Sequence, residues 1–216
     1  MEPLTDPMST SAVSDALDML GVPGQLSGIR AMVPGARCAG PAYTVTFAPV
    51  TDASEGTAAD YLEDVAPGSV VVLDNAGRTD CTVWGDLLTA FAGLRGVAGT
   101  VVWGAARDNA ECVRAGYPVF AADGWMRTGK GRVRRVAVGA PVEIGGVRIE
   151  AGDMIVADDD GVVCVPAAHW PRVCELAGEV ERREAAIKDA LAAGVSLAEA
   201  RRRNRYSDLG PGGQIR

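Results

Sequence analysis

Three polar residues near the middle of the chain have the types and the spacing to do chemistry together. Asp86 stands in the run Trp-Gly-Asp-Leu-Leu, and Arg107 and Asp108 follow with 20 residues between. The guanidinium of Arg107 can donate two parallel hydrogen bonds to a planar carboxylate. The carboxylate of Asp108 is a hard oxygen ligand, which suits a divalent cation that keeps several of its waters. A carboxylate clamp beside a Lewis acid is what enolate chemistry on a 2-oxo acid requires.

Glu111 adds a second acidic side chain three residues after Asp108. Residues three apart lie on one face of a helix, so the pattern predicts that the two carboxylates share a cation. The same residues also fit a simpler interpretation, in which Arg107 and Asp108 form a surface ion pair and Asp86 caps a helix. Spacing alone favours this simpler interpretation, because short motifs recur by chance.

The elements around these residues predict how they are brought together. The run from Ser69 to Leu73 is a strand by composition, an apolar helical stripe follows Asp86, and Thr100 to Val102 is a second strand. If the two strands lie parallel and adjacent, both following helices begin at the carboxyl edge of the sheet, where open α/β sheets bind ligands. Asp86 then faces the Arg-Asp pair across one crevice.

The start of the first of these helices is also a predicted anion site. The first N–H groups of a helix have no partner within it, and the helix dipole favours negative charge there. We therefore expect the backbone around Gly85, Leu87 and Leu88 to bind the carboxylate of a substrate.

Bulk composition indicates a globular enzyme-sized domain. The chain has 216 residues, 48% of them hydrophobic and 23% charged, which is enough for one sizeable core. We expect one α/β domain over residues 1–203 and a polar, glycine-rich tail over residues 204–216. The net charge of −7 predicts no general binding to nucleic acid, because such proteins usually present a basic face.

Cysteine and apolar patterns bear on the compartment. The five cysteines are scattered and form no CxxC pair, which predicts reduced thiols in a cytoplasmic protein. A single histidine, His169, leaves no basis for a histidine-rich metal site. The first residues form no apolar signal segment, and no run of 18 apolar residues exists, so we expect no membrane association.

The remaining elements follow from periodicity and turn residues. The expected helices are Ser9–Leu20 ended by Gly21, a polar helix over Ser54–Val65, a long helix from Pro171 to about Ala193, and a short helix capped by Ser196; the expected strands are Ala42–Pro49 and Pro118–Ala121, with a hairpin at Ile144–Val147.

Two further segments resemble binding loops without matching one. Gly124 to Gly131 misses a P-loop by one residue and precedes a β-like run, so it is predicted to be an exposed turn. Asp158 to Gly161 resembles half a calcium loop, but Val156 occupies the first ligand position. We interpret it as a tight acidic turn between two strands.

Five short runs, taken in order, resemble a known family. They are Gly68–Asp74, Trp84–Leu88, Gly104–Asp108, Tyr117–Phe120 and Gly152–Gly161. This order is similar to that of the RraA-like family over about Ser9 to Gly194. The family contains the 4-hydroxy-4-methyl-2-oxoglutarate aldolases, also called 4-carboxy-4-hydroxy-2-oxoadipate aldolases, and the regulator of ribonuclease E activity. The resemblance implies a three-layer β/β/α swivelling-domain fold and a homotrimer or hexamer with sites between subunits.

The resemblance also implies a role for each site residue and a Mg²⁺ or Mn²⁺ cofactor. Arg107 would bind the pyruvyl carboxylate and keto oxygen, and Asp108 would ligate the metal mainly with waters around it. Asp86 would orient the water that protonates pyruvate enolate. Leu87 and Leu88 would contribute backbone N–H groups to the carboxylate.

Two more acidic positions enter only through the resemblance. Glu111 fits the acidic position that follows Arg-Asp in the family. An acidic residue from a neighbouring subunit belongs to the family's metal shell, and Glu184 is the best match for it, with Glu181 second. The chain departs from the family at Trp103, where members commonly carry Asp. That ring would either narrow the cleft or simply pack in the core.

Together these patterns predict a metal-dependent lyase that cleaves a 4-hydroxy-2-oxo acid to pyruvate. Oxaloacetate decarboxylation passes through the same enolate, so one site could do both. The alternative is a non-catalytic regulator that binds and inhibits a ribonuclease, and a related lyase on another acid is a third possibility. Asp86 favours the enzyme, because regulator members of the family lack that acid.

Overall fold

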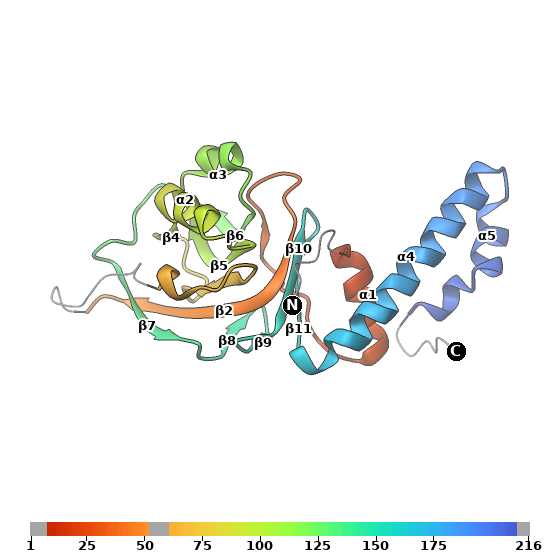
Figure 1. Cartoon of the computed structure of the whole chain (residues 1–216), viewed down its shortest axis with the longest axis horizontal. Coiled ribbons are helices and arrows are strands. Elements are labelled where there is room, and N and C mark those ends of the chain that lie inside the picture. The colour runs from red at the N-terminus through yellow and green to blue at the C-terminus, as the bar shows by residue number, and fades with distance from the viewer. Residues whose placement is uncertain (1–7, 52–60, 211–216) are drawn as a thin grey trace.

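The computed structural model describes residues 8–51 and 61–210, in which helices and strands alternate along most of the chain (Figure 1). The helices are α1 (Thr10–Leu20), α2 (Asp86–Leu94), α3 (Asn109–Ala115), α4 (Trp170–Ala192) and α5 (Leu197–Arg203). The strands are β1 (Arg30–Ala31), β2 (Cys38–Pro49), β3 (Val70–Asp74), β4 (Thr82–Trp84), β5 (Gly99–Ala106), β6 (Val119–Gly124), β7 (Val133–Val138), β8 (Val142–Ile144), β9 (Val147–Ile149), β10 (Met154–Asp158) and β11 (Gly161–Val165).

The centre of the molecule is a mixed sheet in the order β1-β6-β5-β3-β2-β10-β11, with β4 added beside β5 and β7 beside β2. Strands β2, β3, β5 and β6 pair in parallel. The predicted adjacent parallel strands are therefore confirmed, since β3 pairs with β5 from Val70↔Gly99 to Asp74↔Trp103. Helix α2 begins just after β4, which pairs in parallel with β5, and α3 begins just after β5.

Alternation along β3 divides the interior into two layers. Val71 and Leu73 belong to a core cluster that includes Ala92 of α2 and Cys112 of α3, which we call the helix-side core. Val70 and Val72 belong to a second cluster with the β8–β9 hairpin and β10–β11, which we call the sheet-side core. Successive strand residues point to opposite faces, so one strand serves both layers. This arrangement confirms the predicted three-layer β/β/α fold.

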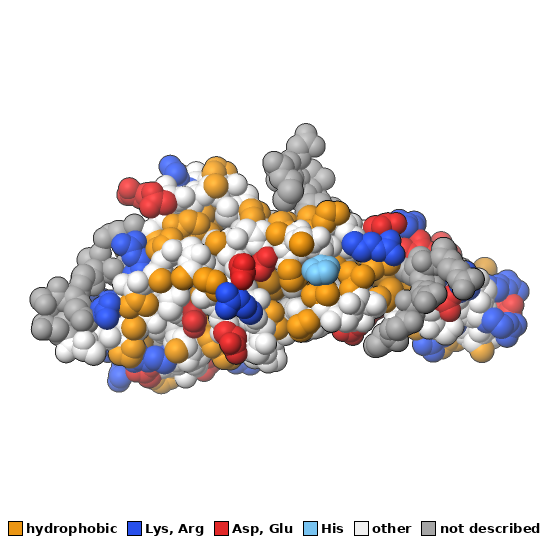
Figure 2. All heavy atoms as spheres, turned by 90° about the horizontal axis from the view of Figure 1, so that it is seen from below, with side chains coloured by type: hydrophobic (Ala, Val, Ile, Leu, Met, Phe, Trp, Pro, Cys, Tyr) orange, Lys and Arg blue, Asp and Glu red, His pale blue; other side chains and the backbone are white. Residues whose placement is uncertain are grey.

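Two helices far apart in the sequence cover the outer surface of β10 and β11. Val13 and Leu17 of α1 pack with Val173 and Leu176 of α4 and with β10–β11 in a third cluster, the outer core. Figure 1 shows α4 and α5 beyond β10 and β11, extending away from the sheet and from α2 and α3. The face seen in Figure 2 carries Lys/Arg and Asp/Glu side chains intermingled, with apolar surface between them.

Several predicted boundaries are confirmed. Ser9 caps α1 by accepting a hydrogen bond from the N–H of Ala12, and Gly21 ends that helix in the left-handed conformation. The long helix begins at Trp170 with Pro171 in its first turn, and the Ser196 hydroxyl caps α5. These features follow from local chemistry, which is why the sequence predicts them.

Other expectations need correction or extension. Strand β2 begins at Cys38, not at Ala42, because its first residues pair with β10. The polar helix predicted over Ser54–Val65 lies partly outside the described residues, and its described end is only a 3₁₀ turn at Leu62–Asp64. Tyr206–Asp208 forms another 3₁₀ turn, after which Leu209 is buried in the outer core.

The two loop interpretations are confirmed. Asp158 accepts hydrogen bonds from the backbone and hydroxyl of Thr10, and Asp159 accepts one from Gly35 N–H, so these carboxylates stabilise turns and a helix start. The segment from Gly124 to Gly131 leads into β7 and not into a helix. Among the residues that the structure describes, no helix is long and apolar enough to cross a membrane.

Candidate active site

Trp84 fixes the strand end from which the site begins. Its side chain is 2% exposed and stacks on Tyr117 with ring centroids 6.0 Å apart. Its indole N–H donates to the Thr89 hydroxyl at 2.9 Å, and that hydroxyl lies 3.3 Å from the sulfur of Cys112. This buried chain of polar atoms ties β4, α2 and α3 together, and the sequence pattern did not predict it.

Asp86, Arg107 and Asp108 meet directly after β4 and β5. The N–H of Asp86 donates to Asp108 Oδ2 at 3.2 Å, and Arg107 Nε lies 3.2 Å from the same oxygen. The N–H of Arg107 donates to the carbonyl of Trp84, which extends the β4–β5 ladder by one step. These three residues therefore do come together, as predicted.

Gly85 makes this contact possible. A Cβ atom on Gly85 would lie 2.7 Å from Asp108 Oδ2 and 3.1 Å from Arg107 Nε. Real Cβ contacts are essentially never that short, so any larger residue would displace the carboxylate or the guanidinium. Gly85 thus contributes by having no side chain, in addition to the backbone role predicted from the sequence.

Asp108 has an unusual backbone. It is the N-cap of α3 in the left-handed conformation, with φ 58° and ψ 35°. Non-glycine residues adopt this region at a cost, and such strain is concentrated at functional sites. The prediction that Asp108 and Glu111 lie on one helical face is wrong, because α3 begins only at Asn109 and Asp108 precedes it.

Glu111 has a partner of its own. Its carboxylate accepts a hydrogen bond from Arg114 Nε at 3.1 Å, and the two side chains form an ion pair in the first turns of α3. Both side chains are more than half exposed, so this pair would exchange readily for another cation. Whether Glu111 ligates a metal stays a prediction.

The predicted anion site at the start of α2 needs one correction. The N–H of Leu87 is not free, because it donates to Asp86 Oδ1 at 2.8 Å. The N–H of Leu88 has no acceptor among the described residues and keeps the predicted role. Asp86 is thus held by its own helix turn through Oδ1, while its Oδ2 has no partner in the described chain.

A comparison with protein-family models shows which family the chain belongs to. The model of the family described as RraA-like, Aldolase/RraA, matches residues 10–164, which is well over half of the chain. The chain belongs to the RraA-like family.

Two relatives of this RraA-like chain differ in how much of their length it covers. Protein DlpA of Legionella pneumophila is 41% identical over 197 residues, which are 89% of this chain but 32% of DlpA, so the chain spans about a third of that relative. A Halalkalibacterium halodurans protein named "Putative 4-hydroxy-4-methyl-2-oxoglutarate aldolase" is 34% identical over 190 residues, 83% of this chain and 85% of that protein.

Solved structures share the RraA-like fold. An uncharacterized protein from Pseudomonas syringae pv. tomato is 42% identical, with a TM-score of 0.85 over 90% of this chain and 92% of the other. RraAS2 of Streptomyces coelicolor, described as an unusual member of the RNase ES inhibitor RraA protein family, is 32% identical, with a TM-score of 0.72 over 82% of this chain and 89% of the other. Both similarities agree with the predicted fold.

The acidic residues predicted to come from a neighbouring subunit of this RraA-like chain lie on α4. Glu181 already has a partner, because it accepts hydrogen bonds from the backbone and hydroxyl of Ser9. Glu184 lies close enough to Asp15 of α1 to raise the pKa of that carboxyl, after the larger effect of burial. Within one chain, α4 lies away from α2 and α3, so Glu184 does not join Asp86 and Asp108 (Figure 1).

Trp103, the departure from the family pattern, packs within the protein. Its half-buried ring contacts the sheet-side core. Gly28 and Gly77 lie so close that a Cβ on either would be 3.2 Å from the ring. The structure therefore supports the packing interpretation of Trp103.

The side chains at this site suit Mg²⁺ or Mn²⁺ better than zinc. Among the described residues, no three or more His, Cys, Asp or Glu side chains gather in a group that could hold a metal ion. Asp108 Oδ1 has no partner in that part of the chain, and the side chain is 34% exposed, so water reaches it. One carboxylate fits Mg²⁺ or Mn²⁺ that keeps most of its waters, whereas zinc needs three or four protein ligands.

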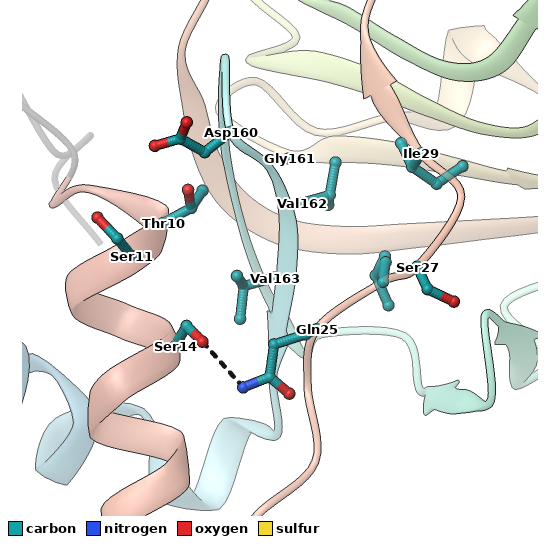
Figure 3. Close-up of a pocket in the computed structure, with 11 residues that line it drawn as sticks. Thr10, Ser11, Ser14, Gln25, Ser27, Ile29, Asp160, Gly161, Val162 and Val163 are labelled. Atoms are coloured by element: carbon teal, nitrogen blue, oxygen red, sulfur yellow. Dashed lines mark hydrogen bonds between the residues drawn. The ribbon is translucent and has the colours of Figure 1, made fainter. Parts of the chain in front are cut away.

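A separate cavity of about 320 Å³ lies beside α1, away from the Arg107 crevice (Figure 3). Hydroxyl and amide groups of Ser11, Ser14, Gln25 and Ser27 line it, over a floor formed by β11. Gln25 already donates to Ser14 at 3.0 Å and to Asp18 at 3.2 Å, so its amide joins α1 to the following segment. No residue of the Asp86–Arg107–Asp108 cluster contributes to this cavity.

Proposed function

We propose that this protein is a divalent-metal-dependent lyase that cleaves a 4-hydroxy-2-oxo acid to pyruvate and a carbonyl compound, and that it also decarboxylates oxaloacetate. The observation that carries the proposal is the contact of Asp86 and Arg107 with one oxygen of Asp108 at the carboxyl edge of the sheet. Similarity to a relative named as a putative 4-hydroxy-4-methyl-2-oxoglutarate aldolase supports the same reaction class.

Arg107 binds the 2-oxo acid in this proposal. Its Nε faces Asp108, and neither terminal nitrogen has a partner among the described residues. Those two nitrogens can donate to a substrate carboxylate oxygen and to the neighbouring keto oxygen. The N–H of Leu88 is available to the same carboxylate. Donors placed where charge develops stabilise the enolate more than the keto acid, and that difference accelerates the reaction.

Asp108 would hold the cation through Oδ1, with waters completing the coordination. A bound Mg²⁺ or Mn²⁺ would supply Lewis-acid stabilisation of negative charge on the keto oxygen. We further propose that Glu184 of a neighbouring subunit, in a homotrimer or hexamer, joins this site, and that Glu111 contributes by exchanging its bond to Arg114 for the cation shell.

Asp86 positions the water that protonates the enolate after cleavage. As the C4 hydroxyl gives its proton to solvent water, the C3–C4 bond breaks, its electron pair enters the enolate, and the carbonyl product leaves. Oxaloacetate gives the same enolate by losing carbon dioxide. The free Oδ2 of Asp86 can hold a water that delivers a proton to C3, which completes pyruvate.

The test is pyruvate release from a panel of 4-hydroxy-2-oxo acids and oxaloacetate. EDTA should abolish turnover, and Mg²⁺ or Mn²⁺ should restore it. Asp86→Asn should lower kcat by roughly 10²–10⁴-fold, as for a lost acid–base group, while oxalate inhibition persists. Arg107→Lys should lose most of kcat/KM and weaken oxalate inhibition, because lysine offers no planar fork. Full turnover without metal, or wild-type kinetics in both variants, would reject the proposal.

Similarity to RraAS2 favours a second candidate, a protein that binds and inhibits a ribonuclease. A binding surface needs no proton relay, so ribonuclease inhibition by the Asp86→Asn variant should equal that of the wild type. Inhibition of RNA cleavage together with no turnover on any acid of the panel would favour this candidate over the lyase.

A further inference from the structure

The residues just after β4, β5 and β6 form one row across the carboxyl edge. Ala106 of β5 pairs in parallel with Trp84 on one side and with Gly124 on the other. The ladder continues one step further, because Arg107 N–H donates to the Trp84 carbonyl and Trp125 N–H donates to the Ala106 carbonyl at 2.9 Å. The next row is therefore Gly85, Arg107 and Trp125.

This row shows which positions of the neighbouring strands lie beside Arg107. Side chains in register on neighbouring strands point to the same face. Gly85 follows the rule, because a Cβ placed on it would lie 3.1 Å from Arg107 Cγ. By the same register, Trp125 lies beside Arg107 on the side away from Gly85. A Cβ atom on Gly124, the residue before it, would lie 2.9 Å from Asn109 Nδ2 at the start of α3, so this segment runs close to the site.

The flank that Trp125 forms is apolar and open. Trp125 is 42% exposed and the following Met126 is 72% exposed, although both side chains are large and apolar. Neither belongs to any of the three core clusters. In the sheet, Trp125 is one strand away from Arg107, so its apolar surface is what the distal half of a 2-oxo acid would meet on the β6 side.

We propose that Trp125 is a specificity-determining residue of this site, and that the half of the substrate released as the carbonyl product carries an apolar or aromatic group that packs on its indole. The inference rests on the proposed lyase function. An aromatic face stacks well on an aryl group and excludes water from it. It offers nothing to a second carboxylate, which would need a cation.

The nearest cation on this segment is Arg127, two residues after Trp125. The pKa of Asp80 is lowered mainly by its hydrogen bonds from Arg78, and the charge of Arg127 adds to this effect. Arg127 therefore lies near an acidic side chain of the β3–β4 loop, and its carbonyl accepts from Thr82. A carboxylate-bearing distal half held by Arg127 is the competing arrangement that the experiment must separate.

The experiment compares three substrates in one pyruvate-release assay with Mg²⁺. They are 4-hydroxy-2-oxo-4-phenylbutanoate, 4-hydroxy-4-methyl-2-oxoglutarate and oxaloacetate, of which only the first has an apolar distal half. Trp125→Ala should lower kcat/KM for the phenyl substrate by about tenfold or more, the scale of a lost apolar pocket contact. It should leave the other two within about twofold, and Trp125→Phe should keep most of the activity on the phenyl substrate.

Further variants and a mass measurement separate a role in specificity from a general loss of activity or assembly. Leu94→Ala removes another exposed apolar side chain, 87% exposed at the far end of α2, and should change none of the three rates. The inference would be overturned if Trp125→Ala lost activity equally on all substrates. It would also be overturned if the wild type preferred the dicarboxylate and Arg127→Ala removed that preference, or if light scattering gave a changed particle mass for Trp125→Ala. If wild type turns over none of the substrates, oxaloacetate included, the proposed lyase function fails and the inference falls with it.

Discussion

At the scale of single residues, the site depends on one carboxylate held in an unfavourable backbone conformation. The left-handed region costs an L-residue roughly 1–2 kcal/mol, although Asp and Asn tolerate it better than most. Asp108 adopts this conformation while its Oδ2 accepts a hydrogen bond from Asp86 N–H and pairs with Arg107 Nε. Asp108 Oδ1 has no partner among the described residues and stays available to a ligand.

The first prediction concerns Gly85. Gly85→Ala would place a methyl group 2.7 Å from Asp108 Oδ2, so the carboxylate and Arg107 must shift. Misplacing catalytic groups by a fraction of an ångström to one ångström costs up to about 100-fold, so kcat/KM for pyruvate release should fall by roughly 10- to 100-fold.

Gly93→Ala is the matched control, because it lies on α2 with nothing within 4 Å of a new Cβ. That variant should keep full activity and gain up to about 1 kcal/mol of stability from better helix propensity. Wild-type kinetics for Gly85→Ala would show that the close contact has no role in the reaction.

The sequence could predict which residues meet here but not how they bond. Arg107 and Asp108 were predictable because they follow a strand whose partner and direction could be inferred, and Asp86 because it starts the helix between the two predicted strands. The bonds of Leu87 N–H and of Glu111 were not, because they depend on side-chain rotamers and on where α3 starts. A one-residue difference in helix start removes the predicted shared face of Asp108 and Glu111.

At the scale of elements, α2 and α3 are joined beneath the site by the contacts of Trp84, Thr89 and Cys112. Burial raises the pKa of the Cys112 thiol, although the hydrogen bond from Thr89 opposes this. The thiol therefore stays protonated and serves as a packing group. Strand β4, which delivers Trp84, has only three residues, and so short a strand carries no periodicity from which to predict it.

The second prediction tests this connection. Thr89→Val keeps the shape but leaves the buried Trp84 N–H without an acceptor, which should cost about 1–3 kcal/mol of folding free energy. For a chain of this length the melting temperature should fall by several degrees, at about 2–4 °C per kcal/mol. Thr89→Ser retains the hydroxyl and should lose distinctly less. Equal losses in the two variants would mean that packing, and not the hydrogen bond, matters.

The third prediction concerns the contact between α1 and α4. The pKa of Asp15 is raised by burial first, then by the charges of Glu184 on α4 and Asp18 on α1. A raised folded-state pKa means that the charged form is disfavoured, so stability is fully present below the ordinary value of 3.8 and falls as pH rises through the folded-state pKa. Asp15→Asn should therefore melt higher than wild type at pH 7.

The advantage of Asp15→Asn should shrink as the pH is lowered toward 3.8, since wild-type Asp15 is then protonated as well. Thermal melts of both proteins across this range provide the measurement. A variant that is less stable than wild type at pH 7 would show that the Asp15 carboxylate forms a favourable contact outweighing the repulsion from Glu184.

At the scale of the whole molecule, a single chain surrounds the Asp86–Arg107–Asp108 site on one side only. Among the described residues no three His, Cys, Asp or Glu side chains gather there, and α4 lies beyond the β10–β11 end of the sheet, away from α2 and α3 (Figure 1). The layered arrangement could be predicted from alternating strands, capped helices and the order of family motifs. The surfaces of the proposed assembly could not be predicted, because surface charge and exposed apolar residues do not specify a partner surface.

The fourth prediction is an assembly with a shared site. Light scattering should give about three or six times the 22.3 kDa of one chain. Glu184→Gln should raise the Mg²⁺ concentration needed for turnover, whereas Glu175→Gln, on the same helix and paired with Arg172, should not. Mixed and refolded Arg107→Lys and Glu184→Gln chains should recover activity, because some sites then receive both wild-type residues. A fully active monomer would contradict the shared site.

Strand β2 has a consequence for the order in which the chain can fold as it is synthesised. Its first half pairs with β10, so Cys38 meets Ala157, and Ser9 at the start of α1 is held by Glu181. A nascent chain can assemble β3, α2, β5 and α3 from neighbouring segments. Its first helix, however, must wait on the ribosome until nearly all of α4 has emerged, since long-range closure comes late. Until β7 and β10 have emerged, one edge of β2 is exposed and open to pairing with a second nascent chain.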